Sequence, residues 1–326
     1  MRTWLLPLIL VAEVALFTSI GAPKFSSASG ALGYFYHYFA DLLAQSTPVL
    51  LLACGMTLIL MTGGIDLSVA SMVALIASAM SMLHPGWQFW WTAIPGGLVL
   101  GLLLGLLNGV LIARLDIPPI VTTLGTMIFY RGLCFVIMED RENSPFIEVP
   151  GYEWLGQFPG AAILVALIFI GGGGYFNRSR WRREILMLGG NRVAARYAGI
   201  RVTRRIYEVY TLMGFLAFLA AVTFTARNSS VSASSLTGLE LHVIVAVVLG
   251  GTRVQGGIGT LTGTFFGVLI LAVLDEGLRG AAVWGDQNLP FKLSHLEYVL
   301  LGLLLVLGVW LNTRERLKTK PVAGAA

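Results

Sequence analysis

Charged residues are scarce in this sequence of 326 residues. Asp, Glu, Lys and Arg make up 12% of it, whereas 56% is hydrophobic and the mean hydropathy is +0.79. Soluble domains are about one quarter charged, so this composition excludes a water-soluble enzyme built around one core. It predicts instead an all-α polytopic membrane protein.

Cysteine and histidine are few, and nucleotide-binding loops are missing. The two cysteines, Cys54 and Cys134, lie within apolar runs, where we expect them to pack as small buried residues. The four histidines lie far apart and show no metal-ligand spacing. No G-x-x-x-x-G-K-[ST] loop occurs, so any ATP must be hydrolysed by a separate subunit. We therefore expect no catalytic residue, metal or cofactor in this chain.

Long apolar runs, in contrast, fill the sequence. A helix needs about 20 apolar residues to cross the roughly 30 Å hydrocarbon core of a membrane. Such runs lie at 4–20, 42–62, 67–83, 92–113, 121–138, 161–176, 206–225, 259–277 and 294–311. A shorter run, 240–252, is expected either to cross with support from its neighbours or to be re-entrant. The sequence thus predicts about ten segments in one membrane domain over 1–312, followed by a basic tail over 313–326.

The positive charge, which gives a net charge of +5, is concentrated in two segments. The loop 177–205 has nine arginines and one acid, and the tail has four Lys and Arg, whereas the loop 139–160 has five acids and one arginine. Excess Lys and Arg marks the cytoplasmic side. We therefore expect the loop 177–205 and both termini to be cytoplasmic. The charge indicates topology rather than binding to nucleic acid. Glu13 interrupts the first run and no A-x-A site follows, so a retained helix is favoured over a cleaved signal peptide.

Glycine recurs every four residues in two of the predicted helices. The positions are Gly97, Gly101, Gly105 and Gly109 in one helix and Gly259, Gly263 and Gly267 in the other. Residues four apart share a helix face, and small residues there let a second backbone approach closely. The pattern predicts tight helix packing. It does not fit a dinucleotide site, because neither set lies in a strand–helix unit.

Residues 62–68, Thr-Gly-Gly-Ile-Asp-Leu-Ser, break the apolar pattern between two runs. Asp66 and Ser68 stand where their side chains would cap the next helix. One interpretation is a capped turn at the cytoplasmic surface. The other is an interrupted helix that lines the transport route, because irregular backbone at membrane depth marks such sites.

Two further segments interrupt the helices. Pro118 and Pro119 forbid a continuous helix, and the next helix then begins with Thr122, Thr123 and Thr126. These hydroxyls either bond their own backbone or line a pathway. The segment 249–259 is rich in glycine, and we expect a re-entrant bend that faces the cytoplasm there.

The middle of the basic loop, Asn191–Ile200, predicts a short helix. Asn191 is a good N-cap, and Gly199 suits the C-terminal end. A short helix with a small-residue face would dock in a partner's groove. The alternative is a basic segment that contacts anionic lipid.

Six motifs occur together in one order. They are Gly63-Gly64-Ile65-Asp66-Leu67-Ser68 with Ser71, Asn108-Gly109, Ile117 to Thr126 with Arg131-Gly132, Gly190-Asn191 with Ala194-Ala195 and Ala198-Gly199-Ile200, Gly250-Gly251-Thr252, and Gly256-Gly257 with Gly259 and Gly263. In this order they resemble the permease subunits of bacterial ABC importers for simple sugars. That group covers ribose, xylose, arabinose and rhamnose and includes the autoinducer-2 permeases. The resemblance spans roughly residues 45–310.

The resemblance implies a transport subunit of the bacterial inner membrane without enzymatic activity. A second copy or a paralogue would complete the translocation path, a periplasmic binding protein would deliver the sugar, and a cytoplasmic ATPase would use ATP and Mg. The ATPase would be contacted through Gly190, Asn191, Ala194, Ala195, Ala198, Gly199 and Ile200.

A neutral polyol needs no buried countercharge, because its hydroxyls can be passed between small polar side chains. The candidates for this pathway are Asp66, Ser68, Asn108, Thr122, Thr123 and Thr126. The candidate hinges or gates are Gly63, Gly64, Gly250, Gly251, Gly256 and Gly257. A secondary transporter or channel for a small polar solute is the alternative function. Glu13, Glu208 and Glu297 are its best support, but they share no spacing that would form a charged relay.

Overall fold

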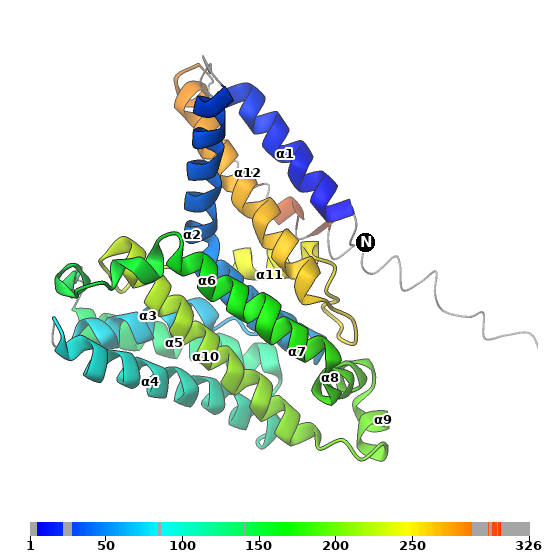
Figure 1. The fold of residues 1–326 in the computed structure, drawn as a ribbon. Helices are drawn as coiled ribbons and strands as arrows, with labels where there is room; N and C mark the ends of the chain where they lie inside the picture. The colour runs from blue at the N-terminus through cyan, green and yellow to red at the C-terminus, as the bar shows by residue number, and fades with distance from the viewer. Residues whose placement is uncertain are drawn as a thin grey trace, which may run out of the picture.

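The computed structural model describes residues 5–21, 28–83, 86–139 and 141–288, with a few isolated positions between 299 and 307. The described chain is helical apart from its loops and one isolated β-bridge between Asn143 and Val231 (Figure 1). Its longer helices are α1 (Leu5–Gly21), α2 (Ala28–Met61), α3 (Val69–Ser81), α4 (Gln88–Ala113), α5 (Pro119–Met138), α10 (Val202–Asn228) and α12 (Leu261–Asn288). The shorter ones are α6 (Gly160–Ala166), α7 (Gly173–Arg178), α8 (Arg180–Gly190), α9 (Arg192–Tyr197) and α11 (Leu239–Leu249).

Helices of membrane-spanning length make up most of the described chain. Six are long and apolar enough to cross, over Leu32–Met61, Gln88–Ala113, Pro119–Met138, Gly160–Arg178, Val202–Asn228 and Leu261–Arg279. The regions Leu5–Leu16, Val69–Ser81 and Leu239–Leu249 are shorter apolar helices. A multi-pass, all-α membrane protein is therefore confirmed, whereas the number of ten segments stays a prediction. The span predicted over 294–311 lies largely outside the described residues.

Two of the predicted boundaries were wrong. Helix α2 begins at Ala28 rather than at residue 42, because the aromatic-rich stretch Tyr34–Phe39 continues the helix. Its 34 residues span about 51 Å, well beyond a hydrocarbon core. The run 161–176 is one helical rod in which a π-helical segment, Leu167–Gly172, joins α6 to α7. Helix α12 begins at Leu261, so Gly259 precedes it.

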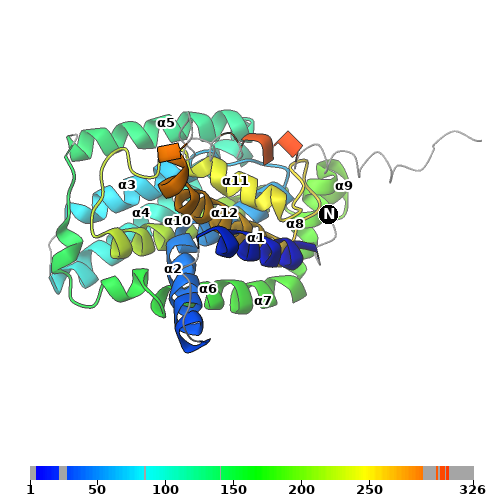
Figure 2. The same cartoon turned by 90° about the horizontal axis from the view of Figure 1, so that it is seen from above.

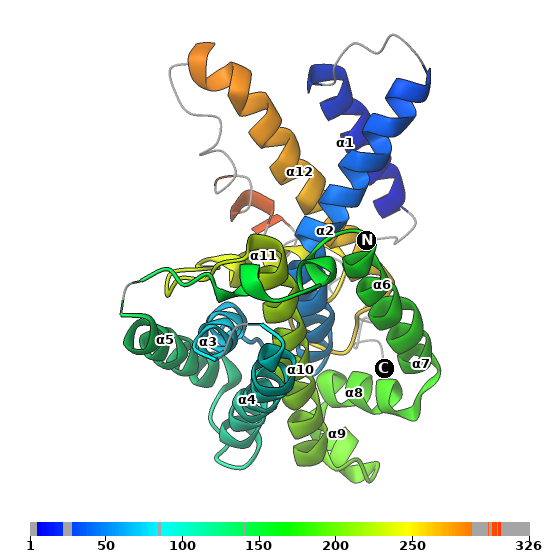
Figure 3. The same ribbon diagram turned by 60° about the vertical axis from the view of Figure 1, so that its left-hand side comes forward.

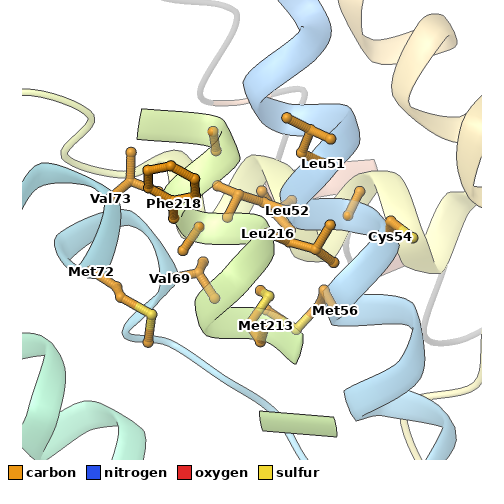
Figure 4. Close-up of a cluster of buried hydrophobic side chains, with 14 of the residues drawn as sticks. Leu51, Leu52, Cys54, Met56, Val69, Met72, Val73, Met213, Leu216 and Phe218 are labelled. Carbon is orange, nitrogen blue, oxygen red and sulfur yellow. The ribbon is translucent and has the colours of Figure 1, made fainter. Parts of the chain in front are cut away.

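Helix α10 lies at the centre of the packing, in contact with α2, α3 and α4. Figure 4 shows Met213, Leu216 and Phe218 of α10 pointing toward side chains of α2 and α3. Cys54 lies in the same core, and Cys134 is buried in α5. Both cysteines are unpaired, as predicted.

The glycines of α4 face α10 so closely that no side chain fits between the helices. A methyl group on Gly101 would lie 2.6 Å from the Gly214 carbonyl oxygen, and one on Gly105 would overlap the Tyr210 carbonyl oxygen. In the second set, a methyl group on Gly267 would lie 2.9 Å from the backbone nitrogen of Gly250 in the turn after α11. The tight packing predicted from the glycine spacing is therefore confirmed, except that Gly259 is not helical.

The helices are arranged so that the two ends of the molecule differ. Helices α5 and α6–α7 lie along opposite edges in the view from above (Figure 2). Helix α12 and the N-terminal half of α2 diverge at one end, and α8 and α9 lie at the other (Figure 3). Helix α1 packs along α12.

Candidate functional site

A network of buried polar side chains joins the loop before α3 to α4 and α5. The Asp66 Oδ1 atom accepts hydrogen bonds from the Ser68 backbone N–H (2.8 Å) and the Ser68 hydroxyl (2.6 Å). The Asn108 side-chain amide donates to Ser68 Oγ (2.9 Å). The Tyr130 hydroxyl lies 3.1 Å from the Leu104 carbonyl oxygen and 3.4 Å from Asn108 Oδ1. Polar groups buried in this way hold their elements in one arrangement.

The prediction that Asp66 and Ser68 cap α3 was wrong. Ser68 is the N-cap residue, but its side chain makes no cap hydrogen bond, because its oxygen accepts from the Asn108 amide while its O–H donates to Asp66. Asp66 accepts from the backbone two residues ahead, which is an Asx turn. Both side chains are fully buried. The polar side chains of the segment 62–68 therefore point into the protein, although Gly63 is exposed.

The threonines of α5 mainly bond the backbone. Helix α5 begins at Pro119, as the two prolines predict. The Thr123 hydroxyl donates to the Pro119 carbonyl (2.9 Å) and lies 3.2 Å from the Ile65 carbonyl oxygen, which places α5 against the turn before α3. The Thr126 hydroxyl donates to the Thr123 carbonyl at 3.3 Å, and Thr122 is buried.

Four of the six predicted pathway residues, Asp66, Ser68, Asn108 and Thr123, thus meet around one turn. Sequence reasoning missed Tyr130, although it follows Thr126 by four residues and so extends a polar stripe along one face of α5. It also missed Tyr210. A methyl group on Gly64 would lie 2.8 Å from the Tyr210 hydroxyl, so this phenol lies against the same turn.

Three segments far apart in sequence meet at the C-terminal end of α2. We call this contact the glycine junction, formed by Met61–Gly63, Gly189 and Gly256–Gly257. The Gly257 N–H donates to the Met61 carbonyl at 3.0 Å. A methyl group on Gly189 would overlap that carbonyl oxygen and lie 2.6 Å from the Gly257 nitrogen. Backbone therefore touches backbone across all three segments.

The predicted hinge glycines have different environments. Gly63, Gly256 and Gly257 belong to the glycine junction, and all three have positive φ angles. Gly64 lies against Tyr210. Gly250 contacts the Gly263 backbone at the start of α12. Gly251 has a positive φ of 90° and open space around it.

The short helix predicted in the basic loop is confirmed as α9. The Asn191 side chain accepts hydrogen bonds from the N–H groups of Val193 (2.9 Å) and Ala194 (3.0 Å), which makes it the N-cap. Gly199 follows the helix with a left-handed φ of 79°. The Ile200 backbone N–H donates to the Ala195 carbonyl oxygen (3.0 Å) at the C-terminal end of the helix.

Two members of the predicted small-residue face of α9, Ala194 and Ala198, are exposed, and their docking role stays a prediction. Ala195 is buried and seats α9 on its own chain. The large exposed side chains are Val193 (62% exposed) and Tyr197 (89% exposed), which share one face because they lie four residues apart. Sequence reasoning passed over this pair, although its spacing was visible. Tyrosine is enriched at protein–protein interfaces.

Helix α8, which was not predicted, anchors α9 to the membrane domain. It buries Ile185 and Leu188. Glu184 pairs with Arg205 at 2.6 Å, and Glu208 accepts from Arg204, Arg205 and the Trp181 ring nitrogen. Glu208, one of the acids offered for a charged relay, is therefore held in an ion-pair network beside α8.

Removing the cap of α9 should weaken this element selectively. In Asn191→Ala the N–H groups of Val193 and Ala194 lose their acceptor, which costs about 0.5–2 kcal/mol of helix stability. We expect faster hydrogen exchange over α9. Asn191→Asp keeps an acceptor oxygen at the same place and should behave as the parent. Equal exchange rates in the two variants would contradict the capping role.

Comparisons with known proteins agree with this architecture. The family model for "branched-chain amino acid transport system / permease component" matches residues 38–309. The ribose import permease protein RbsC of Escherichia coli is 32% identical over 283 residues, 85% of each chain. The L-arabinose transport system permease protein AraH of Escherichia coli is 34% identical, with 79% of this chain and 77% of AraH covered.

The autoinducer 2 import system permease protein LsrC of Klebsiella pneumoniae is 36% identical over 262 residues, 76% of this chain and 74% of its own. No solved structure matches the chain. The resemblance drawn from the six sequence motifs is therefore confirmed. Together with the apolar helices, the match over residues 38–309 shows that this chain belongs to the branched-chain amino acid transport system permease family and is a multi-pass protein of the bacterial inner membrane.

Proposed function

We propose that this chain is the membrane permease subunit of an ABC importer for a monosaccharide or a similar small polyol. The family description names branched-chain amino acids, but the relatives at 32–36% identity are named for ribose, L-arabinose and autoinducer 2. The observation that carries the proposal is this likeness over about four fifths of the chain. A secondary transporter has no such support, since Glu208 is ion-paired with arginines.

The proposed assembly has three kinds of component. Two permease copies, or this chain and a paralogue, form the path, and a periplasmic binding protein delivers the solute. A cytoplasmic ATPase binds ATP and Mg and drives the cycle. The basic loop 177–205 and both termini lie in the cytoplasm, about ten segments lie in the membrane, and the exposed arginines beside α9 also meet anionic lipid.

Helix α9 contacts the ATPase in this proposal, through the exposed pair Val193 and Tyr197. The glycine junction then connects α9 to the interior, because Gly189 is two residues from the cap of α9 and touches the backbone of Met61. From Met61 the chain continues through Gly63 to Asp66 and its network. A displacement of α9 is thereby transmitted through rigid backbone contacts to the turn where the candidate pathway residues meet.

The docking role can be tested by truncating Tyr197. Loss of a central interface aromatic commonly costs about 2 kcal/mol or more, so Tyr197→Ala should weaken ATPase association roughly 30-fold. The matched control is Tyr175→Ala, which removes an equally exposed tyrosine (77% exposed) from α7. Co-purification with the ATPase and uptake are measured for both. Parent-like association of Tyr197→Ala would refute docking through this face.

A further inference from the structure

A cavity of about 230 Å³ lies between α2, α11 and α12, apart from the buried network and the glycine junction. Leucine, valine and alanine side chains form its apolar wall. Its polar lining comes from all three helices and consists of Gln45, Ser46, His242, Asp275, Glu276 and Arg279. We call it the outer polar cavity.

The polar lining is unusual for its position. Leu261–Arg279 is apolar enough to cross a membrane, yet Asp275, Glu276 and Arg279 lie within it. Ionisable residues in such segments are costly, and they commonly mark the route of a substrate or ion. Helix α12 and the N-terminal half of α2 diverge at one end of the molecule (Figure 3), and residues of both helices line the cavity.

The cavity lies far from the proposed cytoplasmic end. Ser46 precedes Met61 of the glycine junction by 15 residues, a distance of about 22 Å along α2. Asp275 follows the start of α12 by 14 residues, about 21 Å. Both positions are past the middle of a roughly 30 Å hydrocarbon core. In the proposed orientation the cavity is thus on the side from which solute arrives.

The lining indicates the chemical class of ligand. Two carboxylates accept hydrogen bonds, an arginine donates them, and Gln45 can do both, which suits a molecule that presents many hydroxyls. Ser46, whose hydroxyl donates to the Leu42 carbonyl (2.7 Å), can still accept, and one ring nitrogen of His242 lies 3.4 Å from the Gly238 carbonyl oxygen. Sites for drug-sized ligands have about 300–1,000 Å³, so 230 Å³ suits a smaller solute. A metal ion is disfavoured, because no group of three His, Cys, Asp or Glu able to hold one is found among the described residues.

We propose that the outer polar cavity is the first binding site in the membrane subunit for a neutral polyhydroxylated solute of monosaccharide size. This inference rests on the proposed function. Hydroxyls of the solute bond to Asp275, Gln45 and His242, while the apolar wall covers its C–H face. The cavity gives weak binding, because the charged groups keep part of their exposure.

The test uses the complete importer reconstituted in vesicles with its binding protein and ATPase. Gln45→Leu, His242→Phe and Asp275→Ala should each reduce uptake of the transported monosaccharide about tenfold or more, since each removes hydrogen bonds to the solute. ATPase association should stay at the parent level, which also shows that the variants fold. His37→Phe alters an exposed histidine of α2 outside the cavity and should leave uptake unchanged.

The outcomes separate this inference from the proposed function. Parent-like uptake by all three cavity variants would overturn the cavity proposal while leaving the importer intact. An unsubstituted chain that shows no ATP-driven uptake with its partners would overturn the proposed function itself. Loss of uptake in His37→Phe to the same degree as in His242→Phe would also count against the cavity.

Discussion

Replacing Gly189 by alanine is expected to reduce ATP-driven uptake by about tenfold or more. The added methyl group would overlap the Met61 carbonyl oxygen, and the two backbones would have to separate. Overpacking of a close contact costs about 1–3 kcal/mol, and a cost of 1.4 kcal/mol is tenfold in an equilibrium constant. The hydrogen bond from Gly257 to Met61 would be strained as well, so motion of α9 would no longer reach the turn at Asp66.

The neighbouring glycine provides the control for this prediction. A methyl group on Gly190 would have no atom within 4 Å, so Gly190→Ala changes the same stretch of α8 without a clash. Gly190→Ala should transport like the parent. Gly189→Ala should still bind the ATPase, because the outward face of α9 is unchanged, and should hydrolyse ATP without moving solute. Equal uptake by the two variants would show that the glycine junction does not transmit motion of α9 to the turn at Asp66.

Replacing Gly105 by valine is expected to have the largest effect on stability. Its Cβ position already overlaps the Tyr210 carbonyl oxygen, and two further methyl groups would push α4 away from α10. Because α10 also packs against α2 and α3, the whole centre of the bundle would shift. We expect the free energy of unfolding to fall by about 3 kcal/mol or more, which is at the upper end of the cost of overpacking.

A second glycine of α4 again supplies the comparison. Gly96 is exposed, and a methyl group there would meet only the end of Leu83 at 3.7 Å. Gly96→Val should therefore leave the thermal midpoint in detergent close to that of the parent, whereas Gly105→Val should lower it strongly and reduce the yield of monodisperse protein. Similar midpoints for both variants would contradict backbone contact between α4 and α10.

The features that the sequence predicts well depend on local spacing. The four-residue repeat from Gly97 to Gly109 predicts close packing, and Asn191 followed by Ala194 and Gly199 predicts α9 with both of its ends. These signals need no knowledge of distant residues. The family resemblance has the same origin, since each motif is a short run.

The features that the sequence did not predict depend on contacts between distant segments. Met61, Gly189 and Gly257 are separated by more than sixty residues at each step, so no window of sequence joins them. Ser68 was read as a cap because Asn108 and Asp66, which occupy its hydroxyl, were not known to surround it. The outer polar cavity likewise requires α2, α11 and α12 to be placed in space.

The central claim is that a separate ATPase drives a small polyol through this chain. Its most direct test is monosaccharide accumulation in vesicles that contain the chain, its ATPase and its binding protein, measured with and without ATP. The account predicts accumulation against a gradient only when all three proteins and ATP are present. Accumulation that needs no ATPase and follows an imposed proton or sodium gradient would contradict it.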